Sequence, residues 1–101
     1  MTDEQQRVAI AEACGWSEVS QAVNTDWMGK HPVGYITGLP DYLNDLNACH
    51  EMEKVLTDEQ LPTYYLELAR ACSTGRALLS ATARQRSEAF LRTTGAWEDG
   101  N

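Results

Sequence analysis

The stretch TARQRSEAFLRTTG, residues 82–95, predicts one complete helix with both ends marked. Thr82 and Gln85 have the spacing of a capping box, in which each side chain accepts a hydrogen bond from the backbone amide of the other residue. Gly95 supplies the left-handed residue that ends many helices. The apolar residues between these signals would turn one face of the helix toward a core. We therefore expect this helix to anchor the fold.

Two further stretches carry the same start signal. Thr2 and Gln5 have the spacing of a capping box, and so do Thr57 and Gln60. Another helix is predicted after Asp41, because apolar residues recur there every three or four positions. The predicted helices span residues 3–14, 41–56, 58–72 and 82–94.

The remaining segments predict a small sheet. Residues 17–38 show no helical period and contain glycine and proline breakers. Within them, residues 33–37 alternate in the manner of a short strand, and residues 77–80 form a short apolar run. The sequence therefore predicts an α+β fold, mostly helical, in a single domain over residues 1–101.

The composition bounds the class of protein. The chain has 101 residues and a formal net charge of −7, and this length suits one domain with its own core. No apolar run approaches the ~18 residues that a membrane span needs, so we expect no membrane partner. Three widely spaced cysteines, Cys14, Cys49 and Cys72, argue against a disulfide framework. We expect reduced, core-packed thiols in a cytoplasmic protein.

Charge is unevenly distributed along the chain. From Arg70 to Arg92, five arginines stand against one acid within this acidic chain. Overall acidity disfavours direct binding to duplex nucleic acid, which requires lysine and arginine to displace counterions. Clustered guanidinium groups can instead hold a phosphate or carboxylate bidentately. The alternative is pairing along a helix surface, because Arg84, Glu88 and Arg92 follow one another at intervals of four residues.

Signatures of catalysis are scarce. The chain has no P-loop, no dinucleotide-binding glycine motif and no nucleophile elbow. His50 and Glu51 lack the second histidine of a zinc-protease helix, since position 54 is Lys54. We therefore expect no catalytic residue, no metal and no cofactor. Trp27 and Tyr35 lie in the irregular segment and are candidates for stacking on a base, with packing under a loop as the equal alternative.

Parts of the chain resemble a known group of proteins. PDYLNDLNA at residues 40–48, continued by HEMEK at residues 50–54, resembles the start of the long helix in small phage proteins of the phage ABA-sandwich domain group. ATARQRSEAFLRT at residues 81–93 resembles a C-terminal helix of phage and prophage proteins, and AEACGW at residues 11–16 is similar to their first helix. The resemblance implies helices around a small sheet that includes residues 76–80. Function is mostly unassigned in such families.

Charge and resemblance together predict two functions. The first is a non-enzymatic phage protein that counteracts host antiviral immunity by sequestering a nucleotide signal, as small phage sponge proteins do with arginines and aromatic rings. The alternative is an acidic inhibitor that mimics DNA and occupies a host defence effector, because complementary charge speeds such encounters. A phage accessory protein with neither activity is the third interpretation.

The predicted anion site centres on the helix that Thr82 opens. Arg84 and Arg86 lie in its first turns, where the backbone amides and the helix dipole favour an anion. These two residues point about 200° away from each other, because they are two positions apart on a helix. Both could reach one ligand only across a subunit interface, so we expect a homo-oligomer. The candidate ligand-binding residues are Arg84, Arg86, Arg92, Arg76, Trp27 and Tyr35.

Overall fold

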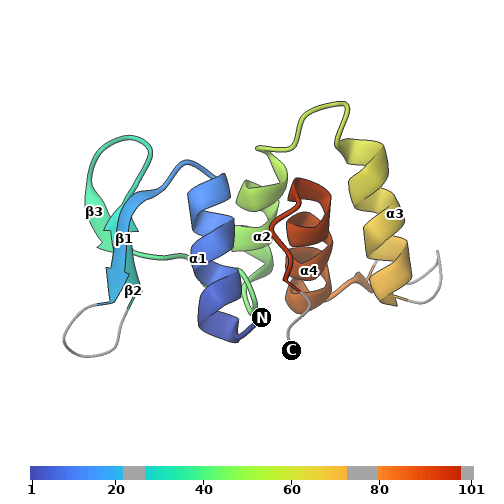
Figure 1. Ribbon diagram of the computed structural model, residues 1–101, viewed down its shortest axis with the longest axis horizontal. Coiled ribbons are helices and arrows are strands. Elements are labelled where there is room, and N and C mark those ends of the chain that lie inside the picture. Colours follow the sequence, from blue (N-terminus) through green and yellow to red (C-terminus); the bar gives the residue numbers. More distant parts are fainter. Residues whose placement is uncertain (22–26, 73–79, 99–101) are drawn as a thin grey trace.

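The computed structural model describes residues 1–21, 27–72 and 80–98, which form four helices and a three-stranded antiparallel sheet (Figure 1). The helices are α1 (Asp3–Ala13), α2 (Leu46–Glu53), α3 (Leu61–Cys72) and α4 (Ala83–Thr94). The strands are β1 (Ser17–Gln21), β2 (Trp27–Lys30) and β3 (Ile36–Gly38), in the sheet order β1-β2-β3. The predicted α+β class with four helices and a small sheet is confirmed.

Helix α4 is the centre of the fold. It packs against α1, α2 and α3, and Figure 1 shows the sheet at one end of the molecule and α3 at the other. Phe90 and Leu91 of α4 are fully buried. They share one core with Ile10 of α1, Met52 of α2 and Tyr64 of α3. Burying a large apolar side chain contributes about 1.5–3 kcal/mol, so the face of α4 holds the other helices in place.

The predicted helix ends are confirmed in α1 and α4. In α1, the Gln5 amide donates to Thr2 Oγ1 at 3.1 Å and the Thr2 amide donates to Gln5 Oε1 at 2.8 Å. Thr82 and Gln85 exchange the equivalent hydrogen bonds at the start of α4. Gly95 follows α4 with a φ of 81°, a left-handed conformation that suits glycine. Local sequence signals therefore fix both of these helices.

The predicted start of the second helix is wrong. This helix, α2, begins at Leu46 rather than at residue 41 and ends before residue 56. The Asp45 carboxylate caps it by accepting the Asn47 amide at 2.9 Å. An N-cap residue has an extended backbone, so the helix cannot continue backward through Asp45. The apolar residues before Asp45 belong to a turn that shares the helical spacing without being helical.

The third helix also starts later than predicted. It begins at Leu61 rather than at residue 58, although Thr57 and Gln60 exchange the hydrogen bonds of the capping box. The residues between them form a turn that leads into α3. Pro62 lies in the first turn of α3, where its missing N–H leaves no hydrogen bond unmade.

The sheet differs from the predicted strands. β3 covers Ile36–Gly38, whereas the alternation predicted a strand over residues 33–37. The first part of that range is a turn, in which the Gly34 amide donates to the His31 carbonyl at 2.7 Å. β1 is mostly exposed and β2 is half-buried around a buried glycine, so neither strand shows the apolar alternation that would have revealed it. Of the predicted strand at 76–80, residues 76–79 lie outside the described residues, and Ser80 belongs to a short helical turn.

The cysteines pack with the core as predicted. Cys49 is fully buried, and its thiol donates to the Tyr42 carbonyl at 3.0 Å. Burial raises the pKa of the Cys49 thiol to about 11. Cys14 and Cys72 are half-buried against the same core. These positions favour a packing role over a nucleophilic one.

Candidate functional site

Arg84 pairs with a carboxylate of another helix. Its two terminal nitrogens donate to the two Asp3 oxygens at 2.9 and 2.8 Å, which is a bidentate arrangement. This hydrogen bonding lowers the pKa of Asp3 and raises the pKa of Arg84. The pair ties α4 to α1 across the surface. It also occupies the two nitrogens that an anionic ligand would use.

Arg86 lies in a different environment, between α4 and the neighbouring helices α2 and α3. Its Nη1 donates to Glu53 Oε2 at 3.1 Å, and its Nε donates to the Ala81 carbonyl at 3.2 Å. The Tyr64 hydroxyl donates to the same Glu53 oxygen. The Arg86 and Glu53 side chains are only 17% and 22% exposed. Arg86 therefore joins three helices instead of facing solvent.

The other arginines of this segment are also paired where the structure describes them. Arg92 donates to Glu88 at 3.1 Å and lies 4.9 Å from the centre of the Trp97 ring. Arg70 donates to Glu67 at 2.9 Å, and Arg76 lies outside the described residues. The structure thus does not gather these arginines around one site. Arg84 and Arg86 leave α4 toward different helices, as their angular separation predicts.

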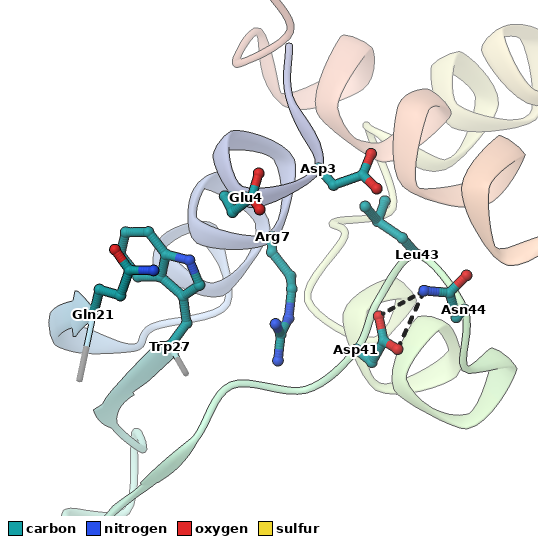
Figure 2. A pocket seen from close by; sticks show the side chains of 8 residues that line it. All are labelled: Asp3, Glu4, Arg7, Gln21, Trp27, Asp41, Leu43 and Asn44. Atoms are coloured by element: carbon teal, nitrogen blue, oxygen red, sulfur yellow. Dashed lines mark hydrogen bonds between the residues drawn. The ribbon is translucent and has the colours of Figure 1, made fainter. Parts of the chain in front are cut away.

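Trp27 lines a polar pocket of about 350 Å³ between α1, β2 and the turn before α2 (Figure 2). Figure 2 shows Arg7 extending from α1 into this pocket. Its guanidinium donates to the carbonyls of Leu39 and Pro40 at 2.6 and 3.0 Å. The other charged groups that line the pocket are the carboxylates of Asp3, Glu4 and Asp41.

The polar pocket is a poor place for a phosphate. The lining holds three carboxylates and one guanidinium, and that guanidinium is already hydrogen-bonded to backbone oxygens. The Trp27 ring packs against the core, and its buried N–H has no hydrogen-bond partner among the described residues. Trp27 is thus partly a packing residue, as the alternative prediction had it. The charge around it favours a cation over an anion.

Tyr35 lines a second and more apolar hollow of about 480 Å³, here called the aromatic groove. The Tyr35 ring stacks on His31 with centroids 4.6 Å apart and planes 8° apart. His31 meets the Trp16 ring edge-on at 5.1 Å. One wall comes from the turn between β2 and β3, and the other from the end of α2. The remaining lining residues are Cys14, Pro32, Pro40, Tyr42, Glu51, Lys54 and Val55.

Local hydrogen bonds shape the wall of the aromatic groove. The Val33 amide donates to His31 Nδ1 at 3.1 Å, and the His31 amide donates to the Tyr35 carbonyl at 2.7 Å. Gly15 lies so close to this turn that an added Cβ would approach Pro32 Cγ to 3.3 Å. The turn is therefore held against the end of α1 by close packing as well as by hydrogen bonds.

The floor of the aromatic groove is a buried polar contact. The Tyr42 hydroxyl hydrogen-bonds with the side chains of Cys14 and Trp16. Burial, followed by this contact with Cys14, raises the pKa of Tyr42 above its ordinary range. Burial raises the pKa of Cys14 to about 11. The Tyr42 hydroxyl and the Cys14 thiol are neutral near pH 7, and the floor presents rings and sulfur instead of charge.

Sequence reasoning missed most of the aromatic groove. It selected Tyr35, but it included Trp16 only in a stretch that is similar to a first helix, and it did not select His31 or Val55. The Trp16 amide donates to the Ala11 carbonyl at 3.0 Å, so its backbone closes the end of α1 while its ring lines the groove. The available signal was the run HPVGY at residues 31–35, in which a proline and a glycine between two aromatic side chains mark a turn.

Other kinds of site find no support in the described part of the chain. Within it, no three histidine, cysteine, aspartate or glutamate side chains gather as ligands for a metal ion. No helix in residues 1–21, 27–72 and 80–98 has the length and apolar character to cross a membrane. Comparison with protein-family models, curated proteins and solved structures gives no match to this chain. The basis for a functional proposal is therefore the geometry of its own side chains.

Proposed function

We propose that this chain is a non-enzymatic binding protein that engages a basic surface of a partner protein. The observation that supports this most is the pairing of every described arginine between Arg70 and Arg92 with a carboxylate of the same chain. A phosphate ligand would have to displace those carboxylates, one of which is held bidentately. A cationic partner meets no such competition.

The surplus acid of the chain is left on the surface. Several exposed carboxylates lie outside the ion pairs of the described residues, on α1, on β1, before α3 and after α4. Such a surface attracts a basic partner and speeds the encounter, an effect that salt screens. These carboxylates are Glu4, Glu12, Glu18, Asp58, Glu59 and Glu98.

The phage resemblance supplies the setting of this proposal. In a phage protein, we infer, the basic partner is a host defence effector that handles nucleic acid in the host cytosol. An acidic protein that covers its nucleic-acid surface would counteract host antiviral immunity by occupancy alone. This function requires binding and no chemical step, so it uses no cofactor.

The test compares two variants of the immobilised chain in a nuclease-treated bacterial lysate. The acid variant carries Glu4→Gln, Glu12→Gln, Glu18→Gln and Glu59→Gln, and the control carries Ser20→Ala and Thr63→Ala at exposed neutral positions. A captured protein is purified and titrated against each variant at low and high salt. We expect the acid variant to bind about tenfold or more weakly, the control to bind normally, and duplex DNA to compete. If the acid variant bound the partner as tightly as the unmodified chain, and salt did not weaken binding, the proposal would be refuted.

A second function, sequestration of a nucleotide signal, is favoured by the stacked His31–Tyr35 pair. The aromatic groove has the volume of sites for small ligands, and a base could stack on the exposed face of Tyr35. The candidate arginines Arg84, Arg86 and Arg92 do not line it, so a second copy would have to supply cations. The predicted homo-oligomer belongs to this second proposal.

Nucleotide sequestration has its own test. The chain is melted in the presence of a panel of cyclic and linear nucleotides. A ligand at 100 times its dissociation constant stabilises the folded state by about 2.7 kcal/mol, a shift that melting detects readily. Release of the intact nucleotide on heating separates sequestration from hydrolysis. If no nucleotide in the panel changed the melting temperature while a partner protein was captured, only the first proposed function would be supported.

A further inference from the structure

Exposed apolar side chains stand next to the groove residue Tyr35 along the chain, on the turn before β3 and at the first residue of β3. Val33 and Ile36 are 77% and 67% exposed, and Tyr35 between them is 55% exposed. On the opposite wall, Val55 follows the end of α2 and is also exposed. Large exposed apolar side chains, on a segment that also lines a hollow of aromatic rings, are typical of a binding surface.

The aromatic groove offers few partners to the backbone of an inserted peptide. Most of its lining consists of rings and aliphatic carbon, and the polar groups of Trp16 and Tyr42 are engaged with each other. Two groups at its rim can donate to a carbonyl, the Tyr35 hydroxyl and the Lys54 ammonium. An ordinary peptide would therefore bury backbone N–H groups without acceptors, which is costly.

Proline-containing segments avoid that cost. Proline has no backbone N–H, and the polyproline II form keeps its carbonyls turned outward. Flat aromatic walls accommodate proline rings, and this form is already ordered before binding. The carbonyls of such a segment would meet the donors at the rim, Tyr35 and Lys54. The chemistry of the groove thus fits an extended proline-containing peptide better than an unrestricted one.

The rim also selects the charge of the ligand. Glu51 pairs with Lys54 at 2.9 Å, but both side chains are about 70% exposed, at 71% and 69%. Ion pairs so exposed are weak, so an arginine or lysine of a ligand can replace Lys54 as the ion-pair partner of Glu51. The net charge of −7 adds long-range attraction for a basic segment and repulsion for a polyanion.

We propose that the aromatic groove binds an extended segment of the partner that contains proline and an adjacent arginine or lysine. Proline rings pack against Tyr35 and Val55, and the cationic side chain pairs with Glu51. This inference rests on the proposed function, because the segment belongs to the basic partner protein. The groove would thus add a specific contact to the general electrostatic attraction between the acidic chain and its basic partner.

The test uses a synthetic peptide of about ten residues, roughly 31 Å long in the polyproline II form, with two prolines and a neighbouring arginine. Its binding to the labelled full chain is followed by NMR titration. Two companion peptides replace the prolines with alanine or the arginine with glutamate. We expect the parent peptide to shift the resonances of His31, Tyr35 and Val55. Each companion peptide should bind about tenfold or more weakly.

Matched variants locate the binding. Tyr35→Ala should weaken binding of the parent peptide about tenfold or more, whereas Tyr65→Ala should not, although Tyr65 is equally exposed, at 56%, on α3. Glu51→Gln should weaken binding, whereas Thr63→Lys makes the same change of one unit in net charge at an exposed position of α3 outside the groove and should have little effect. Chemical shifts of the core confirm that each variant folds.

Several results would overturn this inference. Equal binding of the three peptides would remove the case for proline and charge, and no binding by any of them would remove the groove as their site. If a nucleotide bound in the groove, the groove would belong to the second proposed function. If the resonances of the chain alone shifted with its concentration, the groove would be the contact with a second copy of the chain. Capture of a salt-sensitive partner can still succeed when all peptides fail, so the two proposals are tested separately.

Discussion

The helices around α4 bury their apolar side chains, whereas the sheet region at one end of the molecule leaves several of them exposed. Phe90 and Leu91 of α4 are fully buried, and Arg86 beside them is tied to neighbouring helices. The turn before β3 and the first residue of β3 leave Val33 and Ile36 mostly in water. Burial stabilises the first region, whereas the second keeps apolar area that only a partner could bury. Stability and binding are thus located in different parts of the fold.

Topology explains this division. The helix α4 contacts three other helices, whereas the sheet touches the helical layer mainly through α1 and β1 (Figure 1). A sheet of three strands has two edges and two faces, and here one helix meets it. Gly29 of β2 is buried by Leu39, Val19 and Trp16, so the inner face is filled and the turn projects outward. The exposed rings and aliphatic side chains are therefore fixed in place by a packed base.

The largest effect is expected at the centre of the helical region. Phe90→Ala should lower the free energy of unfolding by about 3–5 kcal/mol, because it leaves a cavity among three neighbouring helices. Ile36→Ala, at a position that is 67% exposed, should change it by less than about 0.5 kcal/mol. Urea denaturation of both variants measures the contrast. Similar losses would mean that the sheet carries as much of the stability as α4 does.

A smaller loss is expected when the contact of Arg86 is removed. Arg86→Met keeps the aliphatic length but leaves the Glu53 carboxylate half-buried without its cation, at a cost of about 1–3 kcal/mol. Arg84→Met should cost less, because the Arg84–Asp3 pair is exposed to water and screened by salt. Thermal melting at two salt concentrations distinguishes the two variants. If Arg86→Met left stability intact and abolished ligand capture, Arg86 would be a binding residue after all.

These two arginines also show where sequence reasoning stops. Arg92 finds Glu88 four residues away, a pairing that helical spacing predicts. Arg84 finds Asp3 across 81 residues of chain, and Arg86 finds Glu53 across 33 residues. No local pattern contains such pairs, so a cluster of arginines in the sequence was interpreted as a site. In the fold it is a set of separate ion pairs.

The fold itself was predictable where its signals are local. The capping residues Thr2 and Thr82 and the left-handed Gly95 act within one helical turn, and they fixed α1 and α4. The turn before α2 combines a local cap, Asp45, with a distant contact, because the Tyr42 carbonyl accepts the Ser87 hydroxyl of α4 at 2.9 Å. Helical spacing in the sequence reveals nothing of that distant contact. The aromatic groove has the same character, since its two walls meet only in the folded chain.

Alkaline pH should weaken the helical region through its buried thiol. Burial raises the pKa of Cys49 from 9.0 to about 11, so in the unfolded chain this thiol ionises first. Its contribution to stability is fully present below pH 9 and is lost as the pH rises from 9 to about 11. Urea denaturation across this interval should show stability falling less steeply for Cys49→Ala than for the unmodified chain. Equal slopes would show that the buried thiol does not contribute to the loss.

A small effect on stability is expected from exposed positions on either side of Tyr35, where stability and binding can be measured in one variant. The double variant Val33→Thr and Ile36→Thr keeps β-branched side chains, which suit an extended backbone, and removes apolar area that water already reaches. The free energy of unfolding should therefore change by less than about 1 kcal/mol in total, since exposed substitutions each cost within about 0.5 kcal/mol. Binding of the proline-containing peptide should weaken severalfold, because the segment around the groove residue Tyr35 loses exposed apolar area. Denaturation and peptide titration on the same sample measure both quantities. A variant that loses stability and keeps its affinity would reverse the roles that we assign to the two regions.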